Sequence, residues 1–250
     1  MAYTKEETII QLNKLKEDID NFYKHCPYRK GNLKGSTIPS DEFIAKYIID
    51  NLLLTENNEY LIKGICPDKR KKYFDKVRRK IDKKEGSKEE IFQRYIYFEH
   101  KLDDELASKL IGEDFIWFEF AGYPKVGKGI DLISYNKTNR LTLYELKFGD
   151  VNEHLLKAIL EIQTYYQRTR YDKLKIDWEQ NCFNCNKPQS HYEKLKLEFD
   201  EKNIRKVLLL DRRTLAFNQF SSNSGNTHLL ELLKIFGIEV IEFDGEKYKI

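Results

Sequence analysis

Three charged residues stand within two apolar, strand-like segments of residues 129–149, "GIDLISYNKTNRLTLYELKFG". Asp131 lies in the first segment, and Glu145 and Lys147 lie in the second. Residues two apart on a strand project to the same face, so Glu145 and Lys147 share one face. Carboxylates and an ammonium gathered in this way could bind a divalent cation and act on a water molecule.

The turn between the two segments decides whether Asp131 joins that face. A three-residue loop at 137–139, with Asn139 in the left-handed conformation, pairs Asn136 with Arg140 and brings Asp131 beside the other two charges. A four-residue loop would move Asp131 to the opposite face, because a shift of one residue in register turns every side chain over. We expect the three-residue loop.

Two carboxylates and an ammonium on one face of a covered sheet are costly unless a cation or a strict ion-pair network balances them. Mg²⁺ is the natural candidate because it prefers oxygen ligands and keeps several waters, and Mn²⁺ could replace it. Lys147 could then orient or help to deprotonate an attacking water and offset charge in the transition state.

The alternative is an edge hairpin on which Glu145 and Lys147 face solvent and discourage sheet pairing. The apolar neighbours Leu143, Leu146 and Phe148 argue against full exposure. Because apolar residues occupy both faces of the hairpin, we expect helices on both sides of the sheet. Apolar periodicity and capping residues predict helices at 4–24, 40–52, 68–84, 91–110, 152–171 and 227–237, and strands at 114–120, 130–135, 141–148, 204–213 and 238–250.

The sequence Asp131, a hairpin and then Glu145-Leu146-Lys147 resembles the PD-(D/E)XK nuclease superfamily, over roughly residues 88–212. The resemblance implies an α/β, restriction-endonuclease-like core of a helix, a three-stranded meander, a crossover helix and a fourth strand. It also implies metal-dependent hydrolysis of phosphodiester bonds, with Asp131, Glu145 and the Leu146 carbonyl as metal ligands and Lys147 as the catalytic lysine. The proline that gives the family its name is absent, since residue 130 is an isoleucine, and this lowers the specificity of the match.

The same resemblance implies an acidic residue from the first helix. Glu99 is our choice because it flanks the apolar stripe that should face the sheet, and Asp104 and Glu105 are its rivals. An ordinary surface glutamate is an equally good interpretation of Glu99.

Many relatives carry a Gln-x-x-x-Tyr element in the crossover helix. Gln167 and Tyr171 fit this spacing literally, whereas Gln163 lies nearer the core-facing stripe, and we favour Gln163 as the catalytic residue. The alternative for Gln163 is an amide satisfied by a backbone group.

A second motif is the basic segment at 68–84, which contains ten Lys or Arg and three Asp. Its apolar residues fall on one helical stripe, so the bases would cover the rest of a helix and could meet nucleic-acid phosphates. The alternative is a solvated lysine-rich helix. The residues expected to bind nucleic acid are Lys69, Arg70, Lys71, Lys72, Lys76, Arg78, Arg79 and Lys80.

The chain contains four cysteines, which are too few for a disulfide scaffold at this length. Cys182 and Cys185 have the spacing of half a zinc site, but a second pair of ligands would have to come from elsewhere in the fold. The insertion that carries them, at about 172–203, holds aromatic residues among lysines that could stack on bases.

The 250 residues carry a net charge of only +3 and are 40% hydrophobic, which fits a globular protein with a sizeable core. No segment has the length and apolar character of a membrane helix, and the first residues lack the order of a secretory signal, so we expect no membrane contact and a cytoplasmic location. We expect a basic helical region at 1–87 that binds nucleic acid, followed by a nuclease domain at 88–250.

The resemblance and the basic segment together predict a Mg²⁺-dependent endonuclease that cuts DNA, with restriction or defence as its expected role. The alternatives are a repair or recombination nuclease, a nuclease directed at RNA, and a binding module that keeps the fold without catalysis. A homodimer would supply the two active sites that a double-strand cutter often needs.

Overall fold

The structure is a computed structural model. The basic segment 68–84, residues 182 and 185 and almost all of the insertion at 172–203 lie outside the residues that it describes. Those residues are 2–16, 22–51, 53–54, 86–99, 102–120, 129–136, 138, 140–169, 171, 174–175, 198–200, 203–222 and 225–248.

The described elements follow the order that the sequence predicts through the middle of the chain. A helix is followed by three strands, a second long helix and a fourth strand. The bounds are α1 (Lys5–Leu15), α2 (Phe22–His25), α3 (Ser40–Asp50), α5 (Lys88–Glu99), α6 (Asp104–Lys109), β1 (Glu113–Phe120), β2 (Ile130–Asn136), β3 (Leu141–Lys147), α7 (Leu155–Arg168), β4 (Arg205–Asp211), α10 (Leu215–Ser221), α11 (Thr227–Ile235), β5 (Ile238–Phe243) and the 3-10 helix η3 (Gly245–Lys247).

One five-stranded sheet organises the fold, with its strands in the order β1-β2-β3-β4-β5. The first three strands form an antiparallel meander, and β3, β4 and β5 run parallel. Helix α7 connects the parallel pair β3 and β4. The predicted fold class, an α/β core of a helix, a three-stranded meander, a crossover helix and a fourth strand with an N-terminal helical region, is confirmed.

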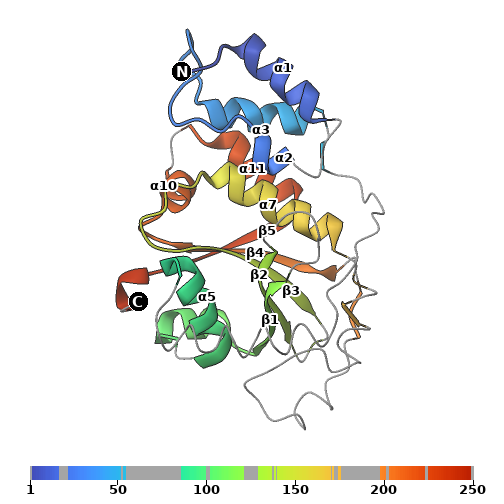
Figure 1. Ribbon diagram of the computed structural model, residues 1–250, viewed down its shortest axis with the longest axis vertical. Helices are drawn as coiled ribbons and strands as arrows, with labels where there is room; N and C mark the ends of the chain where they lie inside the picture. The colour runs from blue at the N-terminus through green and yellow to red at the C-terminus, as the bar shows by residue number, and fades with distance from the viewer. Residues whose placement is uncertain are drawn as a thin grey trace.

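Helices cover both faces of this sheet (Figure 1). Helix α7 packs on β3 and β4, whereas α5 packs on the meander. Helix α3 packs on α11, so the N-terminal helices form an outer layer on the α7 side. All seven residues of β3 are buried, as expected for a strand covered on both faces.

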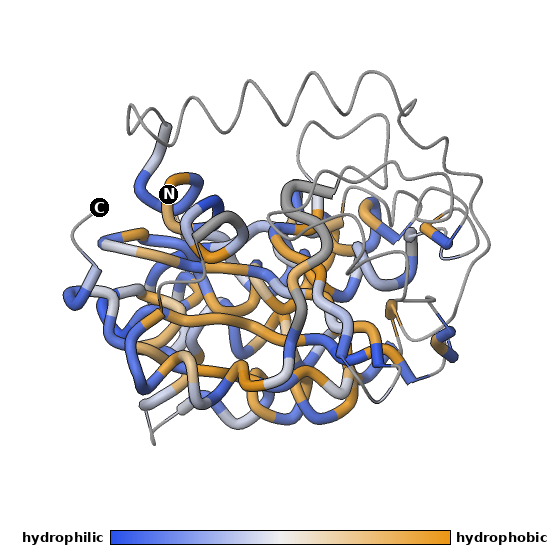
Figure 2. Tube along the Cα trace, turned by 90° about the horizontal axis from the view of Figure 1, so that it is seen from below, coloured by the Kyte–Doolittle hydropathy of each residue, from blue (hydrophilic) through white to orange (hydrophobic). Residues whose placement is uncertain are grey.

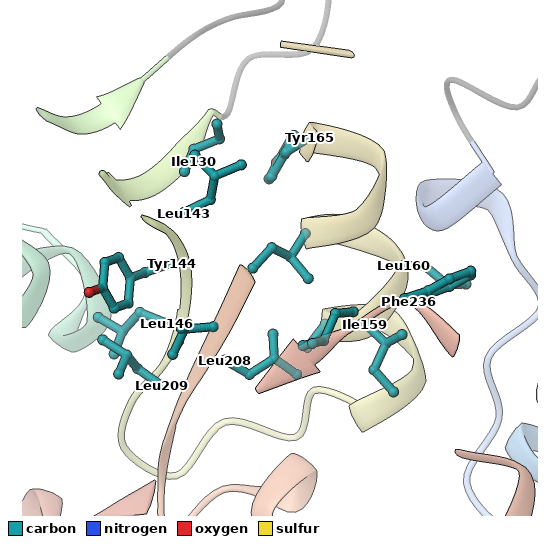
Figure 3. Packing of buried hydrophobic residues seen from close by; sticks show 14 of the residues in the cluster. Ile130, Leu143, Tyr144, Leu146, Ile159, Leu160, Tyr165, Leu208, Leu209 and Phe236 are labelled. Atoms are coloured by element: carbon teal, nitrogen blue, oxygen red, sulfur yellow. The ribbon is translucent and has the colours of Figure 1, made fainter. Parts of the chain in front are cut away.

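Apolar residues follow the strands through the middle of the molecule (Figure 2). Figure 3 shows the packing between α7 and the sheet, where Ile159 lies near Leu208, and Leu146 of β3 lies beside Leu209 of β4. Among the described residues, the structure contains no helix with the length and apolar character required to cross a bilayer.

The β2–β3 hairpin has the predicted register. Tyr135 pairs with Leu141, and the Asn136 amide donates to the Arg140 carbonyl at 3.2 Å. The Asn136 side-chain oxygen also accepts from the Arg140 amide, at 3.1 Å, and closes the turn. Three residues therefore separate the strands, and continuing the register sets Asp131 opposite Glu145. The backbone of residue 139 lies outside the described residues.

The long helix expected at 91–110 is wrong as a single element. Helix α5 ends at Glu99 and α6 begins at Asp104. Asp103 causes the new start, since its side chain accepts a hydrogen bond from the Leu106 amide at 2.8 Å as an N-cap. Thr4 and Glu7 form a capping box at the start of α1.

A buried aspartate ties together three segments at the carboxyl edge of the sheet. Asp211, at the end of β4, is fully buried and accepts from the Gly149 amide at 2.8 Å and the Gly245 amide at 3.3 Å. Arg213 donates to the same carboxylate from Nε, at 3.0 Å. The chain after β3, the end of β4 and the chain after β5 are thereby fixed to one side chain.

We predict that Gly245→Ala lowers the free energy of unfolding by on the order of 2 kcal/mol. A Cβ at this position would collide with the Asp211 carboxylate and the Arg213 guanidinium, and the hydrogen bonds of Asp211 prevent it from moving away. Gly35→Ala is the control, because a Cβ there meets nothing and only the positive φ of 72° opposes it. Denaturant unfolding of both variants measures the difference, and equal losses would show that the collision is relieved.

Candidate active site

The structure places Asp131 on the face of the hairpin that the predicted register requires. Its Oδ2 accepts a hydrogen bond from the Leu146 amide at 2.8 Å, across the hairpin. Gln93 of α5 donates from Nε2 to Oδ1 at 3.3 Å and also to the Asp131 backbone carbonyl. The Asp131 side chain is therefore oriented by the neighbouring strand and by the helix below the sheet.

Lys147 lies at the centre of a group of carboxylates. Its Nζ is 2.6 Å from Glu145 Oε1, 3.0 Å from Glu153 Oε2 and 3.4 Å from Glu161 Oε2. Glu145 and Lys147 project from β3, Glu161 comes from α7, and Glu153 lies just before that helix. Lys147 and Glu145 are only 2% and 3% exposed, so the edge-hairpin interpretation, with solvent-facing charges, is wrong.

Burial and mutual repulsion shift the pKa values of these groups. Burial raises the pKa of Glu145 well above its usual range, and the charges of Asp131 and Glu161 add to the rise. Burial likewise raises the pKa of Asp131. Burial alone would lower the pKa of Lys147, but the surrounding carboxylates outweigh it and raise that pKa well above its usual value. The single ammonium thus does not fully compensate this surplus of carboxyl groups, which resist full ionisation without a further cation.

This surplus fits a cation between Asp131 and Glu145. The second oxygen of Glu145, Oε2, is buried and has no hydrogen-bond partner among the described residues. A buried carboxylate oxygen without a donor is costly, and a hard cation would satisfy it. Among the described residues, no group of three or more His, Cys, Asp or Glu side chains is arranged to hold a metal. Asp131 and Glu145 could hold Mg²⁺ together with a main-chain carbonyl, water and substrate oxygens.

The acid that α5 contributes near this group is Glu89. Its Oε2 accepts from the Phe148 amide at 3.4 Å, and its charge raises the pKa of Asp131. Glu99 is the last residue of α5, ten positions further on, which corresponds to roughly 15 Å along the axis of the helix. The side chain of Glu99 lies outside the described part of the chain, and its metal role stays a prediction.

The rivals of Glu99 lie on α6. Glu105 pairs there with Lys109, Arg212 and Lys247. Its hydrogen bond with Lys109, followed by those with the other two bases, lowers the pKa of Glu105 to about 2. Asp104 is the first residue of α6. Within the described part of the chain, neither acid contacts Asp131 or the Lys147 group, and Glu105 serves as a surface ion-pair partner.

On the crossover helix α7, Glu161 contacts Lys147, rather than the favoured Gln163. Glu161 and Tyr165 have the spacing of the Gln-x-x-x-Tyr element with glutamate in the first place, and the Tyr165 hydroxyl donates to Glu161 Oε1 at 3.1 Å. The four-residue spacing of Glu161 and Tyr165 is visible in the sequence. It was not predicted as a site because the family element has glutamine, not glutamate, at the first position. Glu153 was missed because it precedes the helix and belongs to no motif.

Gln163 is buried and both ends of its amide are occupied. Its Nε2 donates to the Leu54 carbonyl and its Oε1 accepts from Lys206 Nζ, each at 2.8 Å. Gln167 donates to the same carbonyl, and the Tyr171 hydroxyl donates to a backbone carbonyl, at 2.8 Å, within the same region. These contacts match the alternative of a satisfied amide, and the catalytic role of Gln163 remains a prediction.

Stability should depend on pH through Lys206. Burial lowers the pKa of this lysine to about 8, and its Nζ lies over the Tyr166 ring at 4.2 Å. Between this folded-state pKa and the higher pKa of an exposed lysine, the unfolded chain binds more protons than the folded protein. The free energy of unfolding therefore rises with pH across this interval, by roughly 3 kcal/mol in total. We predict that Lys206→Met removes this rise.

The measurement is denaturant unfolding of wild type and Lys206→Met at pH values from about 7 to 11, which spans both pKa values, as a difference between the two proteins so that other titrating groups cancel. Lys46→Met is the control, since Lys46 has an exposed side chain. A difference that stays constant with pH would contradict the expected protonation of Lys206.

Metal binding should be visible without any substrate. We predict that saturating Mg²⁺ or Mn²⁺ stabilises the wild type, by about 2.7 kcal/mol at a concentration one hundred times the Kd. Glu145→Gln should lose this metal effect. In EDTA the same variant should be more stable than the wild type at neutral pH, because a neutral amide removes charge from a group whose pKa burial raises. Thermal unfolding with and without metal checks both expectations, and Glu105→Gln, on the surface of α6, is the control.

No protein-family model matches the sequence, and no curated protein matches it. Among solved structures, similarity is found to a crystal structure of a repair endonuclease from Pyrococcus abyssi, at 17% identity over 58% of this chain and 48% of that chain, with a TM-score of 0.29. A structure of an EndoMS complex with double-stranded DNA is similar at 13% identity over 56% of this chain and 44% of that one, with a TM-score of 0.30. The chain thus spans less than half the length of each, and similarities this weak add nothing to what its own residues show.

Proposed function

We propose that this protein is a metal-dependent nuclease that hydrolyses phosphodiester bonds in DNA. One observation carries the proposal. Asp131 of β2 lies opposite Glu145 of β3, Lys147 shares the face, and the buried carboxylates outnumber the ammonium that they surround. This is the arrangement that the resemblance to the PD-(D/E)XK nucleases implies, and it is built from residues of two neighbouring strands.

Asp131 and Glu145 would hold the Mg²⁺ or Mn²⁺ ion, with the Leu146 carbonyl as a further ligand. When bound, such a metal polarises a phosphoryl oxygen and makes a water molecule more acidic. Lys147 stays protonated among its carboxylates, so it acts as a cation that orients the water and offsets charge on the transition state. Glu153 and Glu161 hold the Lys147 ammonium in place, and Gln93 fixes the side chain of Asp131.

The basic segment would provide affinity for the substrate backbone. Its lysines and arginines would neutralise phosphates, so binding should weaken steeply as salt rises. Phosphate contacts of this kind position the duplex without reading its sequence.

Restriction or defence is the role that we propose for the nuclease, and repair or recombination is the alternative. A homodimer would present two such sites to the two strands of a duplex. RNA as the substrate, and a binding module without catalysis, are the other candidates, and the same assay separates them.

The test is cleavage of supercoiled plasmid, single-stranded DNA and RNA, with Mg²⁺ or EDTA, by wild type and Lys147→Ala. We expect metal-dependent cleavage of DNA by the wild type and a loss on the order of 10²- to 10³-fold in the variant, because a preorganised positive charge is removed. Lys46→Ala, at an exposed ion pair of α3, should cut normally.

Thermal unfolding of Lys147→Ala accompanies the assay, since this variant leaves carboxylates without a partner. If the variant unfolds, Lys147→Met keeps more of the packing and replaces it. Retained binding without cleavage by any protein, with every divalent ion, would favour the binding module. Preferential cleavage of RNA in direct competition would redirect the proposal to that polymer.

A further inference from the structure

A histidine–aspartate pair lies at the start of the crossover helix. His154 Nδ1 is 2.5 Å from Asp41 Oδ2, and Gln219 Nε2 donates to the same oxygen at 2.9 Å. The side chains of Asp41 and His154 are 4% and 15% exposed. Asp41 Oδ1 is buried and has no hydrogen-bond partner in the described ranges, where the contacts of this carboxylate go to the histidine and the glutamine through Oδ2.

Two side chains hold the imidazole, and a third fixes the start of the helix that follows it. Asp41 comes from α3 and engages Nδ1, and the Tyr28 ring stacks on the imidazole at 6.3 Å between centroids and 23° between planes. Gln219 of α10 accepts from the Leu155 amide at 2.8 Å and thereby fixes the start of α7. Since Nδ1 donates to the carboxylate, Nε2 is the ring nitrogen that remains for another contact, and no residue in the described ranges occupies it.

The position of the ring relates it to the Lys147 group. His154 follows Glu153, whose Oε2 is 3.0 Å from Lys147 Nζ, in the segment that leads from the end of β3 into α7. Strands β3, β4 and β5 are parallel, so this segment leaves the sheet at its carboxyl edge. Ligands of open α/β sheets bind outside that edge. In Figure 1, α10 and the start of α7 lie on the same side of the molecule, where the strand β5 ends.

The reaction proposed above creates a need that the Lys147 group does not meet. When water attacks phosphorus, the bond from phosphorus to the leaving oxygen breaks and that oxygen must gain a proton. Lys147 is enclosed by three carboxylates, which hold its protons. A histidine oriented by a buried carboxylate is the arrangement that general acids use.

We propose that His154 is the general acid that protonates the leaving oxygen, and that Asp41 is its positioning residue. The inference rests on the proposed nuclease function. As the bond to phosphorus breaks, its electron pair passes to the leaving oxygen, which takes the proton from Nε2 of the imidazolium. The neutral ring keeps its Nδ1 hydrogen bond to Asp41 and regains a proton from solvent.

The test compares two leaving groups. The cleaved bond is first located by end-group analysis of the products, and an oligonucleotide is then made with sulfur in place of the leaving oxygen at that bond. A thiolate leaves without protonation, whereas an alkoxide does not. Wild type, His154→Gln and Asp41→Asn are assayed on both substrates in single turnover, with one metal throughout.

We expect His154→Gln to slow cleavage of the oxygen substrate by roughly 10²-fold and to leave cleavage of the sulfur substrate nearly unchanged. Asp41→Asn should show the same pattern with a smaller loss. His228→Gln is the matched control, because His228 Nδ1 pairs with the neighbouring carboxylate of Glu42 at 2.9 Å at the start of α11. It should cut both substrates as the wild type does.

Equal losses on both substrates would show that His154 acts on folding or on phosphate contact, and the inference would be wrong. An unaffected oxygen substrate would overturn it equally. Both outcomes leave the nuclease itself intact, whereas a wild type that cuts nothing removes the proposed function and this inference together. Thermal unfolding of each variant separates lost chemistry from lost structure, and if His154→Gln unfolds, His154→Asn is assayed in its place.

Discussion

The constraint on which the structure depends is the burial of one ammonium among several carboxylates. Three glutamates contact Lys147, and Asp131 lies across the hairpin from one of them, at a place where water is largely excluded. Removing such charges from water is costly, and their mutual attraction only partly compensates. These charges stay buried together because the strands and helices that carry them fix their positions. Strand β3 supplies the pair at the centre of the sheet, α7 covers it from one side, and α5 orients Asp131 from the other. A cation at the orphaned oxygen of Glu145 would relieve the remaining surplus.

The N-terminal helices belong to this construction. Buried residues of α2 and α3, such as Phe22, Ile44 and Ile48, lie in the same hydrophobic cluster as the sheet. Polar contacts reinforce the packing, since Glu42 accepts from the backbone amides of His228 and Leu229, at 2.8 Å and 3.1 Å, at the start of α11. Its neighbour Asp41 holds the start of α7. One helical turn of α3 thus fixes the first turns of two core helices, and a change in the outer layer would reach the Lys147 group through α7.

The strands and their register could be predicted from the sequence because a strand repeats every two residues and a short loop allows few geometries. The shared face of Asp131, Glu145 and Lys147 could be predicted from the strand repeat and the loop length. The helical contributions could not be predicted in the same way. An apolar stripe defines the rotation of a helix only to within one or two residues, so Glu161 and Gln163 were both plausible inward positions. Glu89 lies in the first turn of α5, before the apolar stripe becomes regular. The separate helix α6 begins at the N-cap Asp103, which apolar periodicity does not reveal. The order of elements was therefore easier to predict than the facing of individual helical side chains.

Lys147 and Lys206 are both buried on the α7 side of the sheet, and their pKa values shift in opposite directions. The register pairs Leu143 with Lys206 and Lys147 with Leu210, so both lysines project toward α7. Carboxylates surround Lys147 and raise its pKa, whereas Lys206 meets an amide and an aromatic ring, and burial lowers its pKa to about 8. Burial is common to both and cannot explain the difference. On the α7 face, the described carboxylates that contact a buried lysine lie at the end of the sheet where the parallel strands terminate and Asp131 approaches. A network required only for stability would have no reason to place its surplus negative charge at that end, whereas a site for a cation and a phosphodiester would.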